Sequence, residues 1–188
     1  MDNCTECRIQ SLRTHGPINS LHRDGSKLLF LVDYPTAEDA QQGIILSGLN
    51  KRSVAMSNLL HECKINESLI SFASVSKCVT KSKSIGYPEY EVCGKHVLDE
   101  IDRYGIRGIV AFGSVAARLL LGKKVDNIDT VRGRALDTIL PGTFCIITYA
   151  LGILADDEGC GSCGKSVHIT LARKDLNLAA SEAERRRL

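Results

Sequence analysis

The cysteines are the residues with the clearest chemical potential, because eight of them occur in 188 residues. Cys4 and Cys7 form a C-x-x-C pair near the N-terminus, and Cys78 and Cys93 are fifteen positions apart. Two thiolates on a tight turn and two from a separate segment can converge on one metal centre. Four-thiolate coordination suits zinc or an iron–sulfur cluster, and the spacing does not choose between them.

A second C-x-x-C pair, Cys160 and Cys163, lies in the stretch DDEGCGSCGKSVH. Neighbouring thiols chelate metals or close a reversible disulfide. Three interpretations stay open: a redox-closed loop, half of a zinc site that His168 or a partner completes, and an inert insertion. We expect His96, which follows Cys93 on a predicted helix, to be a surface or capping residue rather than a ligand.

Composition and charge narrow the class of protein. The formal net charge is only +2, with 24 basic and 22 acidic residues, so nucleic-acid binding would need local clustering of positive charge. No apolar run approaches the roughly 20 residues that cross a bilayer, and the polar N-terminus lacks a signal-peptide core. We therefore expect a soluble, intracellular protein without a membrane partner, in which the cysteines serve metal or redox chemistry. The length favours one domain over residues 1–188.

Alternating strands and helices must position these residues. Apolar, β-branched segments predict four strands, over residues 27–32, 68–76, 107–113 and 143–149. Helices are predicted over residues 51–63, 89–104, 114–121 and 172–187, the third of them capped by Ser114 and ended by Gly122. This order is typical of an α/β layered fold with a mainly parallel sheet.

The last predicted strand leads into a loop at Tyr149, a place where an α/β enzyme usually presents a catalytic side chain. The residues that follow are Ala150, Leu151 and Gly152, which carry no nucleophile, acid or base. The stretch therefore raises the question of whether an active site has been lost there.

Several spaced motifs resemble those of the iron–sulfur branch of the uracil-DNA glycosylase superfamily. VDYPTAEDAQQGIILSG keeps a proline and two glycines at the spacing of the family's G-E-A-P-G and P-F-x-G motifs. ASVSKC is similar to T-N-x-x-K-C, and AFGSVAARLLLG followed by VRGRAL is similar to A-L-G-x-x-A-x-x-x-L-L-G followed by R-G. The resemblance implies a three-layer α/β/α fold around a central four-stranded, mainly parallel sheet, with DNA as partner.

The same resemblance implies a [4Fe-4S] cluster and assigns residues to it. Its ligands would be Cys4, Cys7, Cys78 and Cys93, which makes the first residues a cluster-binding segment of the single domain. Zinc at Cys160 and Cys163 would be a separate, second centre.

The family's active-site positions carry different residues in this chain. The catalytic carboxylate falls on Asp33, beside Tyr34, and the ring that stacks on the base falls on Leu46. The amide that reads the uracil edge falls on Ser74, whose single hydroxyl cannot offer a paired donor and acceptor. The family's H-P-S motif falls on Ala150, Leu151 and Gly152, so the histidine that stabilises the departing base is replaced by alanine.

For DNA contact the sequence offers a helix start at Ser114, Arg132 in VRG, and the lysines Lys77, Lys81 and Lys83. Backbone N–H groups at a helix start can bind phosphate, and clustered lysines can follow a DNA backbone. A lone helix cap and a solvated lysine loop are the structural alternatives.

Together these observations favour a DNA-binding, glycosylase-like protein with a cluster, impaired or lost uracil excision, and an accessory role beside a DNA polymerase or another replication or repair protein. One alternative is an active glycosylase that removes uracil or a modified base, with Asp33 activating water. Another is a zinc-dependent interaction module without a DNA role.

Overall fold

The computed structural model describes residues 4–48, 50–80, 86–159 and 166–188. Within these ranges five strands form one sheet in the order β2-β1-β3-β5-β4. Its strands are β1 (Leu28–Val32), β2 (Ile70–Ser74), β3 (Gly108–Phe112), β4 (Ala135–Asp137) and β5 (Phe144–Thr148). The first three and β5 are parallel, and β4 pairs antiparallel with β5 at the edge.

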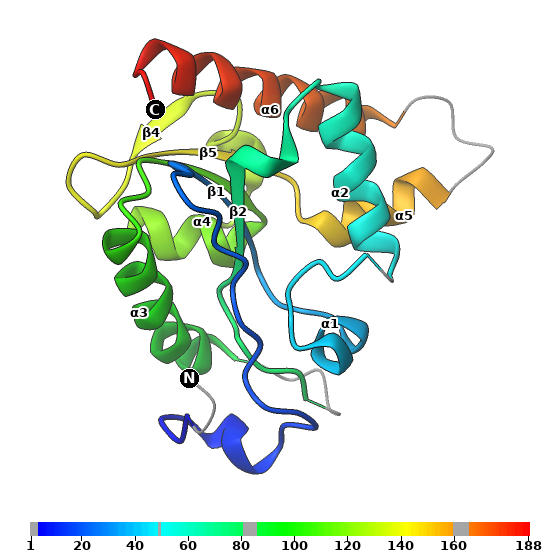
Figure 1. The fold of residues 1–188 in the computed structure, drawn as a ribbon, viewed down its shortest axis with the longest axis vertical. Helices are drawn as coiled ribbons and strands as arrows, with labels where there is room; N and C mark the ends of the chain where they lie inside the picture. The colour runs from blue at the N-terminus through cyan, green and yellow to red at the C-terminus, as the bar shows by residue number, and fades with distance from the viewer. Residues whose placement is uncertain (1–3, 49, 81–85, 160–165) are drawn as a thin grey trace.

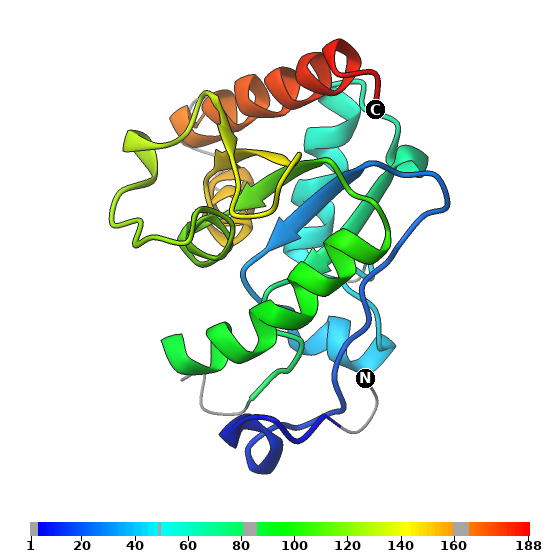
Figure 2. The same cartoon turned by 90° about the vertical axis from the view of Figure 1, so that its left-hand side faces the viewer.

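Helices lie on both faces of this sheet (Figures 1 and 2). Their bounds are α1 (Ala37–Gln42), α2 (Lys51–Glu62), α3 (Tyr87–Arg103), α4 (Ser114–Leu121), α5 (Leu151–Gly159) and α6 (Val167–Arg185), with short 3-10 turns η1 (Arg8–Ser11), η2 (Glu67–Leu69) and η3 (Ile128–Thr130). In the part of the chain that the structure describes, no helix combines the length and the apolar character needed to cross a membrane.

Two hydrophobic cores make this a three-layer α/β/α fold. One core joins α1, α2, α5 and α6 to the sheet face that carries Phe30 and Val32. The other joins α3 and α4 to the face that carries Leu29 and Leu31. Successive residues of a strand point to opposite faces, so the continuous apolar runs of the parallel strands fill both cores. The predicted fold class is confirmed, with a fifth strand added at one edge.

The predicted elements need four corrections. The three-residue β4 was missed because it is too short for a periodic signal. The short α1 was also missed, although Thr36 and Asp39 form a capping box at its start. The expected loop after Tyr149 is instead helix α5, which begins at Leu151 directly after β5, and α6 begins at Val167 rather than near residue 172.

The start of α4 also differs from the prediction. Ser114 is the first helical residue, and Gly113 occupies the cap position without a side-chain hydrogen bond. The side chain of the residue that follows β1 supplies the missing hydrogen-bond acceptor.

Candidate functional site

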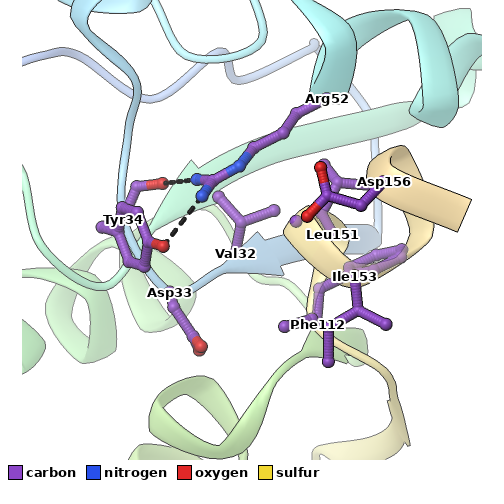
Figure 3. Close-up of a pocket in the computed structure, with 10 residues that line it drawn as sticks. Val32, Asp33, Tyr34, Arg52, Phe112, Leu151, Ile153 and Asp156 are labelled. Atoms are coloured by element: carbon purple, nitrogen blue, oxygen red, sulfur yellow. Dashed lines mark hydrogen bonds between the residues drawn. The ribbon is translucent and has the colours of Figure 1, made fainter. Parts of the chain in front are cut away.

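A pocket of about 280 Å³ lies at the carboxyl ends of the parallel strands (Figure 3). Val32 ends β1, Phe112 ends β3, and Ala150 lies two residues beyond the end of β5, so three neighbouring strands lead into the pocket. The remaining lining residues are Asp33, Tyr34, Arg52, Leu151, Gly152, Ile153 and Asp156. In open parallel sheets, ligands bind at the carboxyl ends of the strands, which makes the pocket the primary candidate site.

Asp33 connects this pocket to helix α4. Its Oδ1 accepts a hydrogen bond from the backbone N–H of Ala116 at 2.8 Å, which satisfies one of the free donors at the helix start. Gly113 has a φ of 108°, and a side chain there would overlap the Asp33 carboxylate, so the glycine is required twice over. Burial raises the pKa of Asp33 from 3.8 to about 6, although the hydrogen bond from Ala116 and the charge of Arg52 oppose this rise.

Arg52 forms one rim of the pocket together with Tyr34. Its Nη2 donates to the Tyr34 hydroxyl at 2.8 Å, its Nη1 donates to the Tyr34 carbonyl at 3.3 Å, and its guanidinium carbon lies 4.4 Å from the ring centre. On the other side a Cβ at Gly152 would come within 3.3 Å of Arg52 Nη2. Gly152 therefore leaves room for the guanidinium over the start of α5.

The structure brings together only some of the predicted base-pocket positions. Asp33, Tyr34 and Ala150 line the pocket at the strand ends. Leu46 instead lines a separate cavity of about 160 Å³, where Met56 and Phe72 are also found. Ser74 is buried as the last residue of β2 and is not among the described residues that line the pocket at the strand ends.

The pocket can therefore do acid–base chemistry beside Asp33. A carboxyl group with a pKa near 6 can accept or donate a proton near neutral pH, and Arg52 can bind an anion or a carbonyl oxygen. On the α5 side, residues 150–153 offer no ionisable side chain, and Asp156 adds a second carboxylate. Sequence reasoning missed Arg52 and Asp156, whose positions on α2 and on the unexpected α5 gave no motif to follow.

The second group of interest is formed by the four predicted cluster cysteines. Cys4 and Cys7 lie on the N-terminal segment, Cys78 follows β2, and Cys93 lies on α3. Figures 1 and 2 show this N-terminal segment beside the start of α3, where Arg8 pairs with Glu89. The sequence pattern thus brings cysteines from three distant segments into one neighbourhood.

The cysteine thiols of this group influence one another's pKa values. Burial raises the pKa of Cys93 to about 11, the backbone N–H of Lys77 opposes this rise, and nearby Cys7, Cys78 and Cys4 add to it. Burial likewise raises the pKa of Cys78, again with contributions from Cys7 and Cys4. Crowded thiolates repel one another, so a bound cation is needed before all of them can ionise.

Tyr90 on α3 is influenced by charges of both the cysteine group and the pocket. Burial raises its pKa to about 12, and the next contributions come from Asp33, Tyr34 and Cys93. A single side chain of α3 is therefore within electrostatic reach of both groups, which makes them neighbours in the fold.

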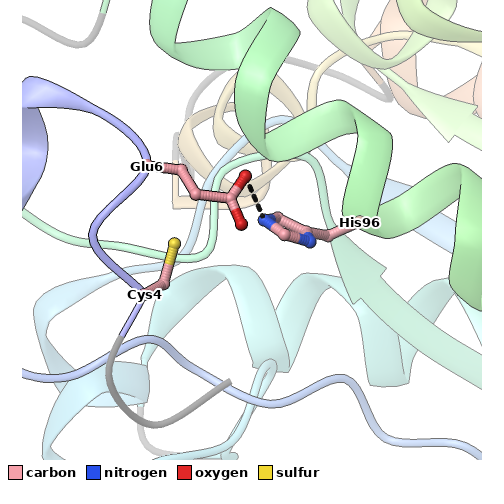
Figure 4. A group of neighbouring side chains, drawn as sticks. All are labelled: Cys4, Glu6 and His96. Carbon is pink, nitrogen blue, oxygen red and sulfur yellow. Dashed lines mark ion pairs between the residues drawn. The ribbon is translucent and has the colours of Figure 1, made fainter.

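A further group joins the N-terminal segment to α3 (Figure 4). The ligand atoms of Cys4, Glu6 and His96 all lie within 4.8 Å of one another, and His96 Nε2 is 3.3 Å from Glu6 Oε2. These three side chains could hold a metal ion, and the surface or capping role of His96 stays a prediction. The signal for its position was present as C-x-x-H over residues 93–96, since residues three apart share a helix face.

Two of the predicted DNA contacts are engaged inside the protein. Lys77 is 1% exposed and pairs with Glu100 at 2.9 Å, and burial lowers its pKa although the Glu100 charge opposes this. Arg132 binds Asp175 through two nitrogens and also donates to the Leu171 carbonyl at 2.9 Å. Both cations are committed to internal partners, so the expectation that they contact phosphate is corrected.

The other predicted DNA contacts have mixed outcomes. Ser114 is exposed at the start of α4, but the Asp33 carboxylate already occupies the anion position of that helix start. Lys81 and Lys83 lie outside the described residues. The structure thus leaves the DNA-contact prediction resting on Ser114 and on these two lysines.

The second C-x-x-C pair, Cys160 and Cys163, also lies outside the described residues. His168, which the sequence offered as a partner for that pair, has its Nδ1 2.9 Å from Asp157 Oδ2 and its ring 4.6 Å from that of Tyr149. Its observed partners are therefore a carboxylate and an aromatic ring.

Comparison with known proteins gives no relative from which a role could be transferred. No protein-family model matches the chain, and no curated protein is significantly similar to it in sequence.

Proposed function

We propose that the protein is a DNA-binding, uracil-DNA glycosylase-like module that carries a [4Fe-4S] cluster and has lost most or all uracil excision. In this proposal it acts as an accessory factor for DNA and for a DNA polymerase or another replication or repair protein. The observation that carries it is the pocket at the strand ends, which keeps a carboxylate at Asp33 but has only Ala150 where the departing base would need stabilisation.

The charges around the pocket support weak excision. Breaking the bond between base and sugar places negative charge on the leaving base, and an enzyme must stabilise that charge with fixed donors. Asp156 adds a second carboxylate to the lining, while the guanidinium of Arg52 already binds Tyr34. One engaged cation beside two acidic side chains is a poor environment for a developing anion.

The separation of the other family positions points the same way. A base held in the pocket would meet neither Leu46 nor Ser74, because these residues lie elsewhere in the fold. Loss of base stacking alone removes about 1–3 kcal/mol of binding per base. Recognition of uracil would therefore need contacts that the family pattern does not include.

The four thiols influence one another's pKa values, which supports a shared metal centre. Four-thiolate coordination suits zinc or an iron–sulfur cluster, and the resemblance to the family favours the cluster.

Iron analysis of anaerobically purified protein tests the cluster. We expect about four irons per chain and a brown colour in the wild type, and loss of both in Cys78→Ser. Cys63→Ser is the matched control, because this half-buried cysteine lies at the end of α2, away from the cluster segment. Full iron content in Cys78→Ser, or a brown colour lost equally in Cys63→Ser, would contradict the ligand assignment.

DNA binding is tested by titrating short single- and double-stranded oligonucleotides at increasing salt. We expect binding that weakens as salt rises, and weaker binding when Lys81 and Lys83 are both changed to glutamine. Exchange of Lys77 for glutamine is not a clean test, because this side chain is buried. Absence of binding at low salt by iron-loaded protein would overturn the DNA role.

One observation favours an active glycosylase as the second candidate. Asp33 lies in the pocket with a pKa raised to about 6, which is the range in which a carboxylate activates water at near-neutral pH. In that case base release should rise with pH as Asp33 ionises and should disappear in Asp33→Asn. The amide can still accept the hydrogen bond from Ala116, so the variant removes charge while it keeps the helix cap.

A further inference from the structure

The group formed by Cys4, Glu6 and His96 differs in its donor atoms from the four cysteines of the proposed iron–sulfur cluster. It combines a thiol, a carboxylate and an imidazole within 4.8 Å, and the three side chains come from the N-terminal segment and from α3. Figure 4 shows Glu6 and His96 facing each other with Cys4 beside them. These three donor types are the ones that zinc takes from proteins.

The imidazole nitrogen at this place forms an ion pair with Glu6 but no hydrogen bond of good geometry among the described residues. His96 Nε2 is buried and has no hydrogen-bond partner among the described residues, although Glu6 Oε2 lies 3.3 Å away. A buried polar atom is normally hydrogen-bonded, so a contact without hydrogen-bond geometry calls for an explanation. An ion held between the nitrogen and the carboxylate would provide it.

The distance between the two groups also fits a shared metal. With zinc–nitrogen and zinc–oxygen bonds of about 2.0–2.2 Å, two ligands of one tetrahedral ion are about 3.4 Å apart. The observed 3.3 Å between His96 Nε2 and Glu6 Oε2 agrees with that spacing. Glu6 is exposed, with 56% of its side chain accessible, so an ion can enter from solvent and keep a water molecule as fourth ligand.

We infer that Cys4, Glu6 and His96 form a site for one zinc-class divalent cation. This goes beyond the proposed function, because of these three residues only Cys4 takes part in the proposed cluster. Cys4 cannot serve both centres at once, so the mononuclear site and the complete cluster exclude each other. The mononuclear form therefore belongs to iron-free protein, and binding there releases the thiol proton of Cys4.

Cobalt titration of reduced, iron-free full-length protein tests this site, because Co²⁺ bound to a thiolate gives visible and near-ultraviolet absorption bands. The background carries Cys160→Ser and Cys163→Ser, which removes the other chelating pair from the signal. We expect one Co²⁺ per chain, displaced by Zn²⁺. His96→Gln and Glu6→Gln should each weaken binding by at least about 100-fold, since even outer-shell partners of a metal contribute about 10- to 100-fold.

Cys78→Ser provides the decisive control. It should abolish the iron–sulfur cluster and leave Co²⁺ binding intact. His96→Gln should weaken Co²⁺ binding and leave the iron–sulfur cluster intact. Thermal melting without metal verifies that each variant is folded. Co²⁺ binding lost in Cys78→Ser but unchanged in His96→Gln, or no stoichiometric Co²⁺ binding at all, would overturn the mononuclear site, whatever the outcome for iron.

Discussion

Asp33 has two tasks in this structure, and they place opposite demands on its charge. As acceptor for the Ala116 N–H at the start of α4 it is better ionised, because a helix start favours negative charge. As a largely buried carboxyl group it is better neutral, and burial prevails, because the pKa is raised to about 6. The residue is therefore protonated in part of the population near neutral pH.

This raised pKa predicts a pH dependence of stability. Because the folded state binds the Asp33 proton more tightly than the unfolded chain, its contribution is fully present below about pH 4 and is lost as pH rises through 6. The free energy of unfolding of the wild type should thus fall by up to about 3 kcal/mol across that window relative to Asp33→Asn. Urea unfolding of both proteins from pH 4 to pH 7 measures this difference, and parallel pH profiles would refute it.

Among the individual residues of the site, the sequence indicated some and not others. Asp33 could be predicted because it follows a strand in a recognisable motif, and Ala150 because it ends the run after β5. Arg52 and Asp156 could not, since helix residues reach the pocket only through the packing of α2 against α5. Glu6 is likewise positioned by the docking of the N-terminal segment on α3.

At the scale of elements, the pocket depends on how helices begin after strands. Only Gly113 separates the end of β3 at Phe112 from the start of α4, and α5 begins at Leu151, shortly after β5. Gly113 allows the first of these turns, because its backbone has a φ of 108° and the Asp33 carboxylate fills the place of a side chain.

Alanine at Gly113 should therefore destabilise the protein by more than backbone strain alone. Strain at such a backbone conformation costs about 1–3 kcal/mol, and the clash with Asp33 adds to it. Gly142→Ala is the matched control, because Gly142 also has a positive φ of 72° but no atom within 4 Å of the added carbon.

A double-mutant cycle separates the two contributions. Combining Gly113→Ala with Asp33→Ala removes the clashing carboxylate, so the double variant should be more stable than the sum of the single effects predicts. Chemical denaturation of the four proteins gives the coupling free energy. Simple additivity would mean that the carboxylate does not constrain Gly113.

The elements were predictable where local signals were strong. The four parallel strands followed from apolar, β-branched runs that fill two cores, and α4 from Gly122 at its end. Helix α5 was missed because its sequence resembles a loop. A glycine follows its first residue, and its acidic end leads into the second C-x-x-C pair. Its formation depends on packing against α2 and α6, which a single segment does not reveal.

At the scale of the whole molecule, a buried ion pair attaches the C-terminal helix to the segment before β4. Asp175 on α6 is completely buried and binds Arg132, whose side chain is 12% exposed. The residue that the sequence offered as a DNA contact therefore connects two distant parts of the chain. Local motif reading could not show this, because the partner lies 43 positions away.

Breaking this pair should be costly. Asp175→Asn leaves the Arg132 charge buried with a weaker partner, and loss of one partner of a buried pair costs about 3–5 kcal/mol. Asp126→Asn is the control, because its pair with Lys124 is largely exposed and should contribute little. Equal stabilities of the two variants in urea unfolding would contradict the structural role of Arg132.

The sequence predicts the overall architecture better than it predicts the chemistry of the pocket. A three-layer fold with a pocket at the strand ends of its one sheet could be anticipated from the order of strands and helices. The chemistry of that pocket depends on a few side chains, which the order of strands and helices does not specify.

The most direct test of the account is therefore a base-excision assay. Anaerobically purified protein of verified iron content is incubated with DNA that contains uracil or a modified base, and alkali-labile sites are counted. The account predicts no cleavage above the level of Asp33→Asn, together with retained DNA binding. Robust cleavage that disappears in Asp33→Asn would contradict it and would identify the pocket as a working active site.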